Sequence, residues 1–195
     1  CSPSTKHLKQ ALLFAEKGIS LFIEKPLSNS LNGIDDLVEI VKEKGIISMV
    51  GYVLRFNKAL IAFKDILNEN KYGSVIRIES VASSYLPSWR PNLDYTRSVS
   101  ANRSLGGGVI LELSHEIDYL RLLFGKPKKV TVKDISKTNS LFDIETNIIA
   151  IFEYSEKYPI VRMRLNMLSK NTKRYCKVYL DNSTLTIDHM NNSLL

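Results

Sequence analysis

Two short segments hold side chains whose spacing could carry proton transfer. Lys25, within Glu24-Lys25-Pro26, follows directly on an apolar run at residues 20–23. A second segment, opened by three glycines at 106–108, holds Glu112, His115 and Glu116. A carboxylate three helical residues from an imidazole can contact it, fix its tautomer and raise its pKa, and partial burial can lower the pKa of a lysine. These residues predict general acid–base chemistry in a cleft.

Each segment also has a plainer interpretation. Lys25 could be a solvated lysine in a turn that Pro26 fixes, with a cis bond as one option. Helical spacing places one apolar stripe toward the core, at Ile110, Leu113, Ile117, Leu120 and Phe124. The opposite face, with Glu112, His115, Glu116 and Tyr119, could then be only the wet side of an amphipathic helix. The glycines indicate either a close approach of the backbone to a ligand or another chain, or a tight turn.

A third candidate is the segment 86–105, which has no regular pattern. It contains the only Trp of the chain and several aromatic or charged side chains: Trp89, Arg90, Asp94, Tyr95, Arg97 and Arg103. Aromatic rings stack on sugars or bases, and Arg binds carboxylate or phosphate through paired donors. The segment is therefore either a binding loop or a surface excursion that Trp89 pins to the core.

The elements that must position these residues change character along the chain. The first part predicts helix, strand, helix and strand at 5–17, 20–23, 31–44 and 46–50, which is typical of a parallel, doubly wound sheet whose strands are apolar on both faces. A helix at 57–70, a long strand at 74–85 and the helix at 108–124 come next. Later strands joined by short turns predict an antiparallel sheet, near 128–137, 146–154, 159–168, 174–180 and 184–188.

Composition narrows the class of protein. The 195 residues are 44% hydrophobic and carry a net charge of +7, which fits either a solvated basic surface or an anionic ligand such as a nucleotide sugar. No aromatic–basic nucleic-acid module is found, and no apolar run approaches the roughly 20 residues of a membrane span. Two cysteines indicate a reduced, cytoplasmic setting. No metal spacing is present, and His7 and His189, without neighbouring partners in the sequence, are interpreted as surface or packing residues.

The order of these motifs resembles the glucose–fructose oxidoreductase, inositol dehydrogenase and MocA (Gfo/Idh/MocA) family of NAD(P)-dependent sugar dehydrogenases. The matching segments are Cys1-Ser2-Pro3-Ser4 with His7, Glu24-Lys25-Pro26, Gly51–Phe56 and Gly106–Asp118. The resemblance implies an α/β fold in which residues 1–52 form the C-terminal half of a Rossmann-type parallel sheet. Residues 53–195 would form an α+β domain for substrate binding and oligomerisation, with a largely antiparallel sheet. The Trp89–Tyr95 loop resembles members found with nucleotide-sugar and nonulosonic sugar pathways.

This resemblance implies hydride transfer between the nicotinamide of NAD or NADP and a carbon of a sugar or nucleotide sugar. Lys25 would contact the reacting hydroxyl and either take its proton or stabilise its charge, His115 would be the second proton-handling group, and Glu112 the acid beside them. The cofactor side would comprise Ser2, Pro3, His7, Glu24, Lys25, Pro26 and Arg55. The substrate side would comprise Trp89, Arg90, Tyr95 and Glu116.

Two departures from the family pattern stand out. The family has Asp four residues before its His, whereas position 111 is Leu and Glu112 stands three residues before His115. A longer side chain at a shorter spacing could reach the same place, or the acidic role is altered. The family also begins with a strand, Gly-x-Gly-x-x-Gly and a helix, which this sequence lacks. The resemblance thus implies a fragment, incomplete also at its C-terminus, that binds NAD(P) weakly or not at all when alone.

Two functions of other classes stay open. The chain could be a non-catalytic module for sugar binding or oligomerisation, or a hydrolase or lyase on the same scaffold. A broad open sheet must bury its second face, which predicts a homo-oligomer formed through the antiparallel sheet.

Overall fold

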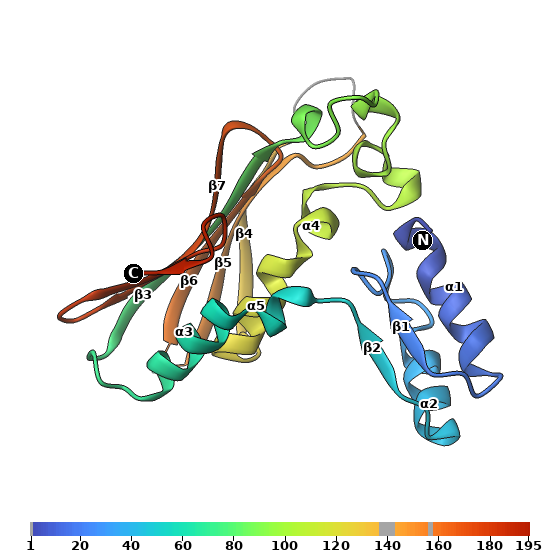
Figure 1. Cartoon of the computed structure of the whole chain (residues 1–195), viewed down its shortest axis with the longest axis horizontal. Coiled ribbons are helices and arrows are strands. Elements are labelled where there is room, and N and C mark those ends of the chain that lie inside the picture. Colours follow the sequence, from blue (N-terminus) through green and yellow to red (C-terminus); the bar gives the residue numbers. More distant parts are fainter. Residues whose placement is uncertain (1, 137–142, 156–157) are drawn as a thin grey trace.

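Two sheets organise the chain in the computed structural model, which describes residues 2–136, 143–155 and 158–195 (Figure 1). Cys1 lies outside the described residues. The smaller sheet pairs β1 (Leu21–Ile23) with β2 (Ser48–Val50) in parallel, and α1 (Ser4–Ala15) and α2 (Ile34–Lys44) lie on one side of it. The predicted order of helix, strand, helix and strand is therefore present.

Local sequence explains these elements. Leu8, Ala11 and Ala15 recur at helical spacing on the buried face of α1. Gly45 ends α2 in the left-handed conformation, with φ of 61°, as a C-terminal glycine does. The strands are apolar on both faces, as predicted, but among the described residues β1 is buried on one face only and no residue of β2 is buried. Phe22 is 69% exposed and Met49 37%.

In the described part of the chain, the larger sheet has seven strands in the order β4-β5-β6-β3-β7-β8-β9. Their bounds are Val75–Tyr85 for β3, Lys129–Ser136 for β4, Asn147–Ser155 for β5, Tyr158–Asn166 for β6, Leu168–Leu180 for β7, Thr184–Asp188 for β8 and Ser193–Leu194 for β9. All neighbours pair antiparallel except β3 with β6. The predicted fold class is confirmed, with two additions that the sequence analysis lacks: this parallel pair and β9.

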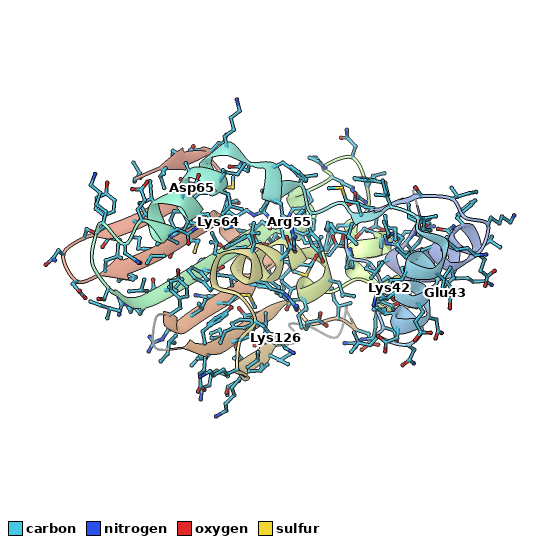
Figure 2. The ribbon with its side chains drawn as sticks, turned by 90° about the horizontal axis from the view of Figure 1, so that it is seen from below. Lys42, Glu43, Arg55, Lys64, Asp65 and Lys126 are labelled. Carbon is cyan, nitrogen blue, oxygen red and sulfur yellow. The ribbon has the colours of Figure 1, made fainter. Side chains whose placement is uncertain are left out.

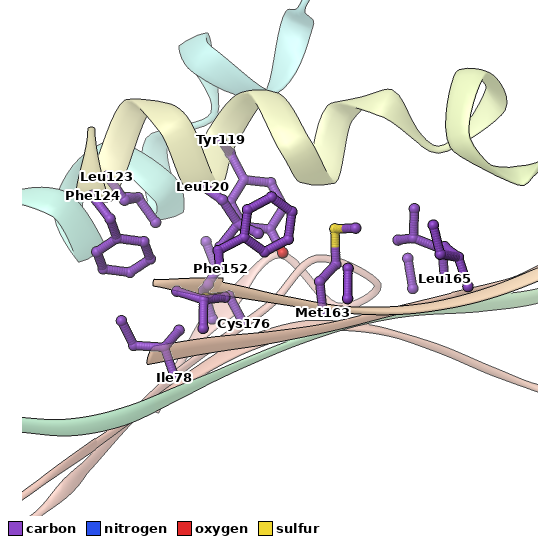
Figure 3. Packing of buried hydrophobic residues seen from close by; sticks show 14 of the residues in the cluster. Ile78, Tyr119, Leu120, Leu123, Phe124, Phe152, Met163, Leu165 and Cys176 are labelled. Atoms are coloured by element: carbon purple, nitrogen blue, oxygen red, sulfur yellow. The ribbon is translucent and has the colours of Figure 1, made fainter. Parts of the chain in front are cut away.

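One face of the large sheet is covered by α3 (Lys58–Asn68), α4 (Val109–Glu112) and α5 (Ser114–Phe124). Asn57 caps α3, because its side chain accepts a hydrogen bond from the Leu60 N–H. Figure 3 shows the central packing, in which aromatic and aliphatic side chains of α5 lie on the sheet: Tyr119, Leu120, Leu123 and Phe124 above Ile78, Phe152, Met163 and Cys176. Each such buried side chain contributes about 1.5–3 kcal/mol of hydrophobic stabilisation.

The predicted helix at 108–124 is two helices. The backbone of Leu113 leaves the helical conformation, with φ −99° and ψ 30°, and this turn rotates α5 relative to α4. The buried stripe of α5 consequently runs through Glu116, Tyr119, Leu120, Leu123 and Phe124. All five residues of the predicted apolar stripe contact the core, but the interpretation of the opposite face as wet was wrong for Glu116 and Tyr119, which are both 0% exposed.

Residues 86–107 hold short 3-10 turns rather than one open loop: η2 (Leu86–Ser88), η3 (Tyr95–Arg97), η4 (Val99–Ala101) and η5 (Arg103–Leu105). Asp94, Ser98 and Asn102 each accept a hydrogen bond from a backbone N–H at the start of a turn. One further turn, η1 (Val53–Phe56), links the small sheet to α3. Within the described residues no helix is long and apolar enough to cross a membrane.

Candidate active site

Lys25 stands at the carboxyl end of β1, followed by a cis peptide bond to Pro26. Its Nζ donates a hydrogen bond of 2.9 Å to the backbone carbonyl of Glu112 and lies 3.9 Å from Glu112 Oε2. The two side chains are 19% and 20% exposed. Lys25 therefore bridges the small sheet and α4, and it is a partnered side chain in a part-buried place rather than a solvated lysine in a turn.

His7 fixes the backbone around Lys25. Its ring nitrogens lie 2.8 Å from the Pro26 carbonyl oxygen and 2.9 Å from the Ser2 carbonyl oxygen. The residue is 7% exposed, so of the two interpretations, surface or packing, the second holds. One imidazole thus ties the segment before α1 to the segment after β1.

The glycines at 106–108 allow close approach between segments of this protein. A Cβ on Gly107 would lie 2.6 Å from the Ser100 carbonyl oxygen and nearer still to that of Val99. Gly108 has φ of 118° and faces the Glu145 carboxylate. The run therefore packs the start of α4 against the preceding turn and against Glu145.

His115, in the first turn of α5, does not have the environment that the sequence predicts. Burial, followed by the charges of Arg174 and Lys25, lowers the pKa of His115 to about 4, although Asp118 opposes the shift. The expected rise through a neighbouring carboxylate was wrong, because Glu112 contacts Lys25 and the break at Leu113 separates Glu112 from α5. The ring meets Tyr52 edge-on, with centroids 5.6 Å apart, and Nδ1 has no partner among the described residues. His115 is therefore a neutral imidazole at neutral pH.

Beneath His115 lies a tight ion pair. Arg174 Nε of β7 donates to Glu116 Oε1 at 2.6 Å, and the Glu116 side chain is 0% exposed. Because Glu116 has no accessible surface here, its predicted contact with substrate is not supported, and it holds Arg174 instead. The ring of His189, which follows β8, lies 5.0 Å from that of Tyr119, and burial with the Arg174 charge lowers the pKa of His189 to about 4.

An open pocket of about 410 Å³ collects most of the predicted residues. Its lining comprises Ser2, Pro3, Ser4, His7, Glu24, Lys25, Pro26, Arg90, Val99, Ser100, Gly106 and Glu112. The small sheet, the 86–107 segment and α4 meet there. A second pocket of about 430 Å³ shares Ser2, His7 and Glu24 and has an apolar wall that includes Phe14 and Phe22.

Three predicted residues have other contacts. Arg55 forms a two-point ion pair with Asp118, at 2.8 and 2.6 Å, which fastens η1 to α5. Trp89 packs against the large core and donates from Nε1 to Ser84 Oγ at 3.0 Å, so it pins its segment to the sheet. Tyr95 likewise packs against this core. Sequence reasoning did not find Arg174 or a role for His189, because both reach the site through long-range strand pairing.

Among the described residues, no group of three or more His, Cys, Asp or Glu side chains could hold a metal ion. The pocket instead offers the ammonium group of Lys25 and the carboxylates of Glu24 and Glu112, and the neutral imidazole of His115 lies outside its lining. Such a set can bind a hydroxyl group, stabilise charge on its oxygen and accept its proton.

Comparisons with known proteins match both parts of the chain. Residues 1–52 match the description "Oxidoreductase family, NAD-binding Rossmann fold", and residues 60–186 match "GFO/IDH/MocA C-terminal domain". A 2,7-anhydro-N-acetylneuraminate hydratase from Mediterraneibacter gnavus is 27% identical over 132 residues, which are 67% of this chain and 34% of that protein.

Two solved structures show the same fold. An inositol dehydrogenase homolog from Azotobacter vinelandii, complexed with NAD⁺, has a TM-score of 0.86 at 15% identity, covering 100% of this chain and 52% of that one. The WlbA dehydrogenase from Bordetella pertussis, with NADH and UDP-GlcNAcA, has a TM-score of 0.81 at 18% identity, covering 96% and 54%. The chain spans about half the length of these solved relatives and about a third of the hydratase.

Proposed function

Because the chain belongs to the GFO/IDH/MocA oxidoreductase family, we propose that it forms part of an NAD(P)-dependent enzyme acting on a sugar or nucleotide sugar. The family resemblance drawn from the motifs is confirmed. We further propose that residues 1–52 serve the cofactor and residues 53–195 the substrate. The observation that carries the proposal is the Lys25 ammonium, which joins the small sheet to α4 at the edge of a pocket.

The residues present fit the nicotinamide end of such a cofactor. Ser2 and Glu24 line both pockets and Pro3 lines one of them, at the carboxyl end of β1, where ligands of parallel sheets bind. The neighbouring pocket adds the apolar wall of Phe14 and Phe22, suited to a flat ring. When bound, the nicotinamide would supply hydride chemistry, which the side chains of the protein do not provide.

Lys25 and His115 have different roles toward the substrate hydroxyl. Nζ of Lys25 uses one donor on the Glu112 carbonyl and is held near the Glu112 carboxylate, which leaves donor capacity for a substrate hydroxyl. There the ammonium group would stabilise negative charge on the hydroxyl oxygen. His115, which precedes the buried Glu116 in the first turn of α5 and is neutral at pH 7, is the residue we assign to accept the hydroxyl proton and to return it in the reverse direction.

Replacement of Lys25 tests this assignment in the full-length protein. Lys25→Met keeps the stem but removes the ammonium group, and turnover followed at the nicotinamide absorbance should fall by about 10²–10⁴-fold. Lys42→Met is the matched control, because Lys42 lies at the exposed end of α2 (Figure 2). Full activity of the Lys25 variant, with an unchanged melting temperature, would refute the role.

A homo-oligomer formed through the large sheet is the second part of the proposal. Among the described residues no helix covers the other face of this sheet (Figure 1), and that face mixes isoleucine with aromatic and charged groups. Arg77 lies 4.1 Å from the Tyr179 ring centroid, and Ile160 is 40% exposed. Sedimentation should show an oligomer that Ile160→Asp weakens and Ile19→Asp, on the small layer, does not. A monomeric wild-type protein would refute it.

A lyase or hydrolase on this scaffold is the competing activity, and the similarity to a hydratase favours retaining it. Nicotinamide absorbance separates the two, because net reduction of the cofactor occurs only in a dehydrogenase. We also place the protein in a reducing cytoplasm, since Cys176 is a buried free thiol, and cell fractionation tests this placement.

A further inference from the structure

Arg174 has a geometry that its role in the core does not require. Its Nε donates to Glu116, whereas no hydrogen bond from its terminal Nη groups is found among the described residues. The side chain keeps 29% exposure, although the Glu116 side chain beneath it has none. One edge of the guanidinium is therefore fixed, and its terminal donors remain available at an accessible place.

The position of Arg174 on β7 points it toward the site. Arg174 pairs with Ala82 of β3 and lies on the same sheet face as Cys176 and Val178, which are both fully buried under the helices. Along this face of β7, the buried core therefore ends at Arg174, whose side chain is partly exposed to solvent. Glu116 stands next to His115 in the first turn of α5, so Arg174 reaches the same end of that helix.

Electrostatics place a second cation nearby. The charges of Arg174, on β7, and Lys25, after β1, both act on His115. Asp118, which binds Arg55, and Glu116 are the acidic groups facing this end of α5, and each is already engaged by an arginine. An anion at Arg174 would therefore lie near His115, which adjoins Glu116 in the first turn of α5.

We propose that Arg174 binds an anionic group of the substrate, a carboxylate or a phosphate, next to His115, and that Glu116 positions the guanidinium for it. This deepens the proposed function, on which it rests, by naming an anionic sugar as the substrate class. Arginine suits the task because it presents paired, permanently charged donors that match carboxylate and phosphate oxygens. Apolar residues of similar volume can often replace a buried ion pair without loss of stability. Stability of the core alone therefore does not require the partly exposed guanidinium of Arg174.

Ligand binding to the 195-residue chain, without cofactor or turnover, tests this inference. The three histidines, His7, His115 and His189, can be followed by NMR and assigned with single His→Gln variants. Titration with glucuronate should shift the His115 and His189 ring signals, whereas glucose at equal concentration should shift them less. A second arm compares inorganic phosphate and UDP with uridine and distinguishes phosphate from carboxylate as the group bound.

Three variants decide the origin of the effect. Arg174→Gln should weaken binding of the anionic probe about tenfold or more and leave the response to its neutral counterpart unchanged. Arg174→Lys keeps a charge for Glu116 but loses the fork, so it should give an intermediate loss and decides the matter if Arg174→Gln does not fold. Arg121→Gln, exposed at the far end of α5, is the matched control.

Equal affinity of wild type and both Arg174 variants for glucuronate, phosphate and UDP would overturn the inference, as would equal responses to charged and neutral probes. Binding through Arg174 combined with full turnover of Lys25→Met would instead sustain the inference and refute the proposed catalytic role of Lys25. The two failures are therefore distinguishable.

Discussion

Two carboxylate–cation pairs, whose carboxylates stand four residues apart along the chain, differ in almost every physical respect. Lys25 and Glu112 join the small sheet to α4 with 3.9 Å between Nζ and Oε2, and both side chains are about one fifth exposed. Arg174 and Glu116 join β7 to α5 at 2.6 Å, and Glu116 is fully buried. The first, the open pair, borders the pocket. The second, the closed pair, lies under the helix that carries His115.

The difference in burial and distance between the two pairs corresponds to two tasks in a polar site, binding substrate and fixing geometry. The part-buried Lys25–Glu112 pair is long, at 3.9 Å, and weakly held, so its ammonium group can exchange Glu112 for a substrate oxygen at little cost. A buried pair is expensive to form and more expensive to break, so it fixes geometry. The cations of both pairs lower the pKa of His115, after burial as the largest cause.

The largest expected effect comes from removing one partner of each pair. Glu116→Ala leaves Arg174 without its counter-charge and opens a cavity in the core, which should lower the free energy of unfolding by about 3 kcal/mol. Glu112→Ala keeps the backbone carbonyl that accepts from Lys25, and it should cost less than about 1 kcal/mol. Urea unfolding of both variants measures the contrast. Similar losses would show that the two pairs do not differ in burial and strength.

Most of this architecture, unlike the closed pair, can be predicted from local sequence. Helical spacing predicted α1 and α2, and Gly45 correctly marked the end of the second. The run of strands after residue 128 predicted the antiparallel sheet. The parallel pairing of β3 with β6 was not predicted, because the partner of a strand is chosen by long-range packing rather than by its own residues.

The same contrast between local sequence and long-range packing applies to the site. Lys25 was found because a residue following a parallel strand lies at the ligand edge of the sheet. The faces of α4 and α5 were misassigned because a single non-helical residue, Leu113, resets the helical phase, and its sequence does not mark the break. Arg174 sits in an ordinary alternating strand, so only the arrival of β7 under α5 reveals its contact with Glu116.

The second prediction concerns the glycines at 106–108. They precede α4, which carries Glu112 of the open pair. Gly107→Ala would push a Cβ against the carbonyl oxygens of Val99 and Ser100, so the start of α4 must move. We expect a loss of about 2 kcal/mol in the free energy of unfolding and a displaced Glu112 carbonyl. Gly18→Ala is the control, since its Cβ would meet nothing within 4 Å and only its φ of 71° is strained. If both variants cost the same, steric overlap is not the cause.

The third prediction uses the histidines as reporters of the two pairs. The pKa values of His115 and His189 are lowered from 6.5 to about 4, so the unfolded chain binds more protons than the folded one between these values. Stability should therefore be constant above pH 6.5 and fall as the pH drops toward 4, by about 1 kcal/mol for each histidine after allowance for partial exposure. His189→Asn should remove about half of the fall in urea unfolding.

The pKa values of the two histidines also distinguish the effect of Arg174 from that of Lys25. Arg174 lowers the pKa of both histidines, whereas Lys25 contributes only to that of His115. NMR titration of Arg174→Gln should show both pKa values raised, and that of Lys25→Met only the value of His115. A raised pKa of His189 in the Lys25 variant would mean that the open pair reaches deeper than its geometry indicates.

The smallest expected effect is the response of the two pairs to salt. A double-mutant cycle over Lys25→Met and Glu112→Gln should give a coupling of about 0.5 kcal/mol that largely disappears in roughly 1 M NaCl, where charges are screened within about 3 Å. The corresponding cycle over Arg174→Gln and Glu116→Gln should give a larger coupling that changes little with salt, because Glu116 is inaccessible to ions. A salt-sensitive coupling at Glu116 would mean that solvent enters beneath α5 and that the guanidinium is not rigidly held. Arg174 would then lack the fixed geometry on which recognition of an anionic sugar depends.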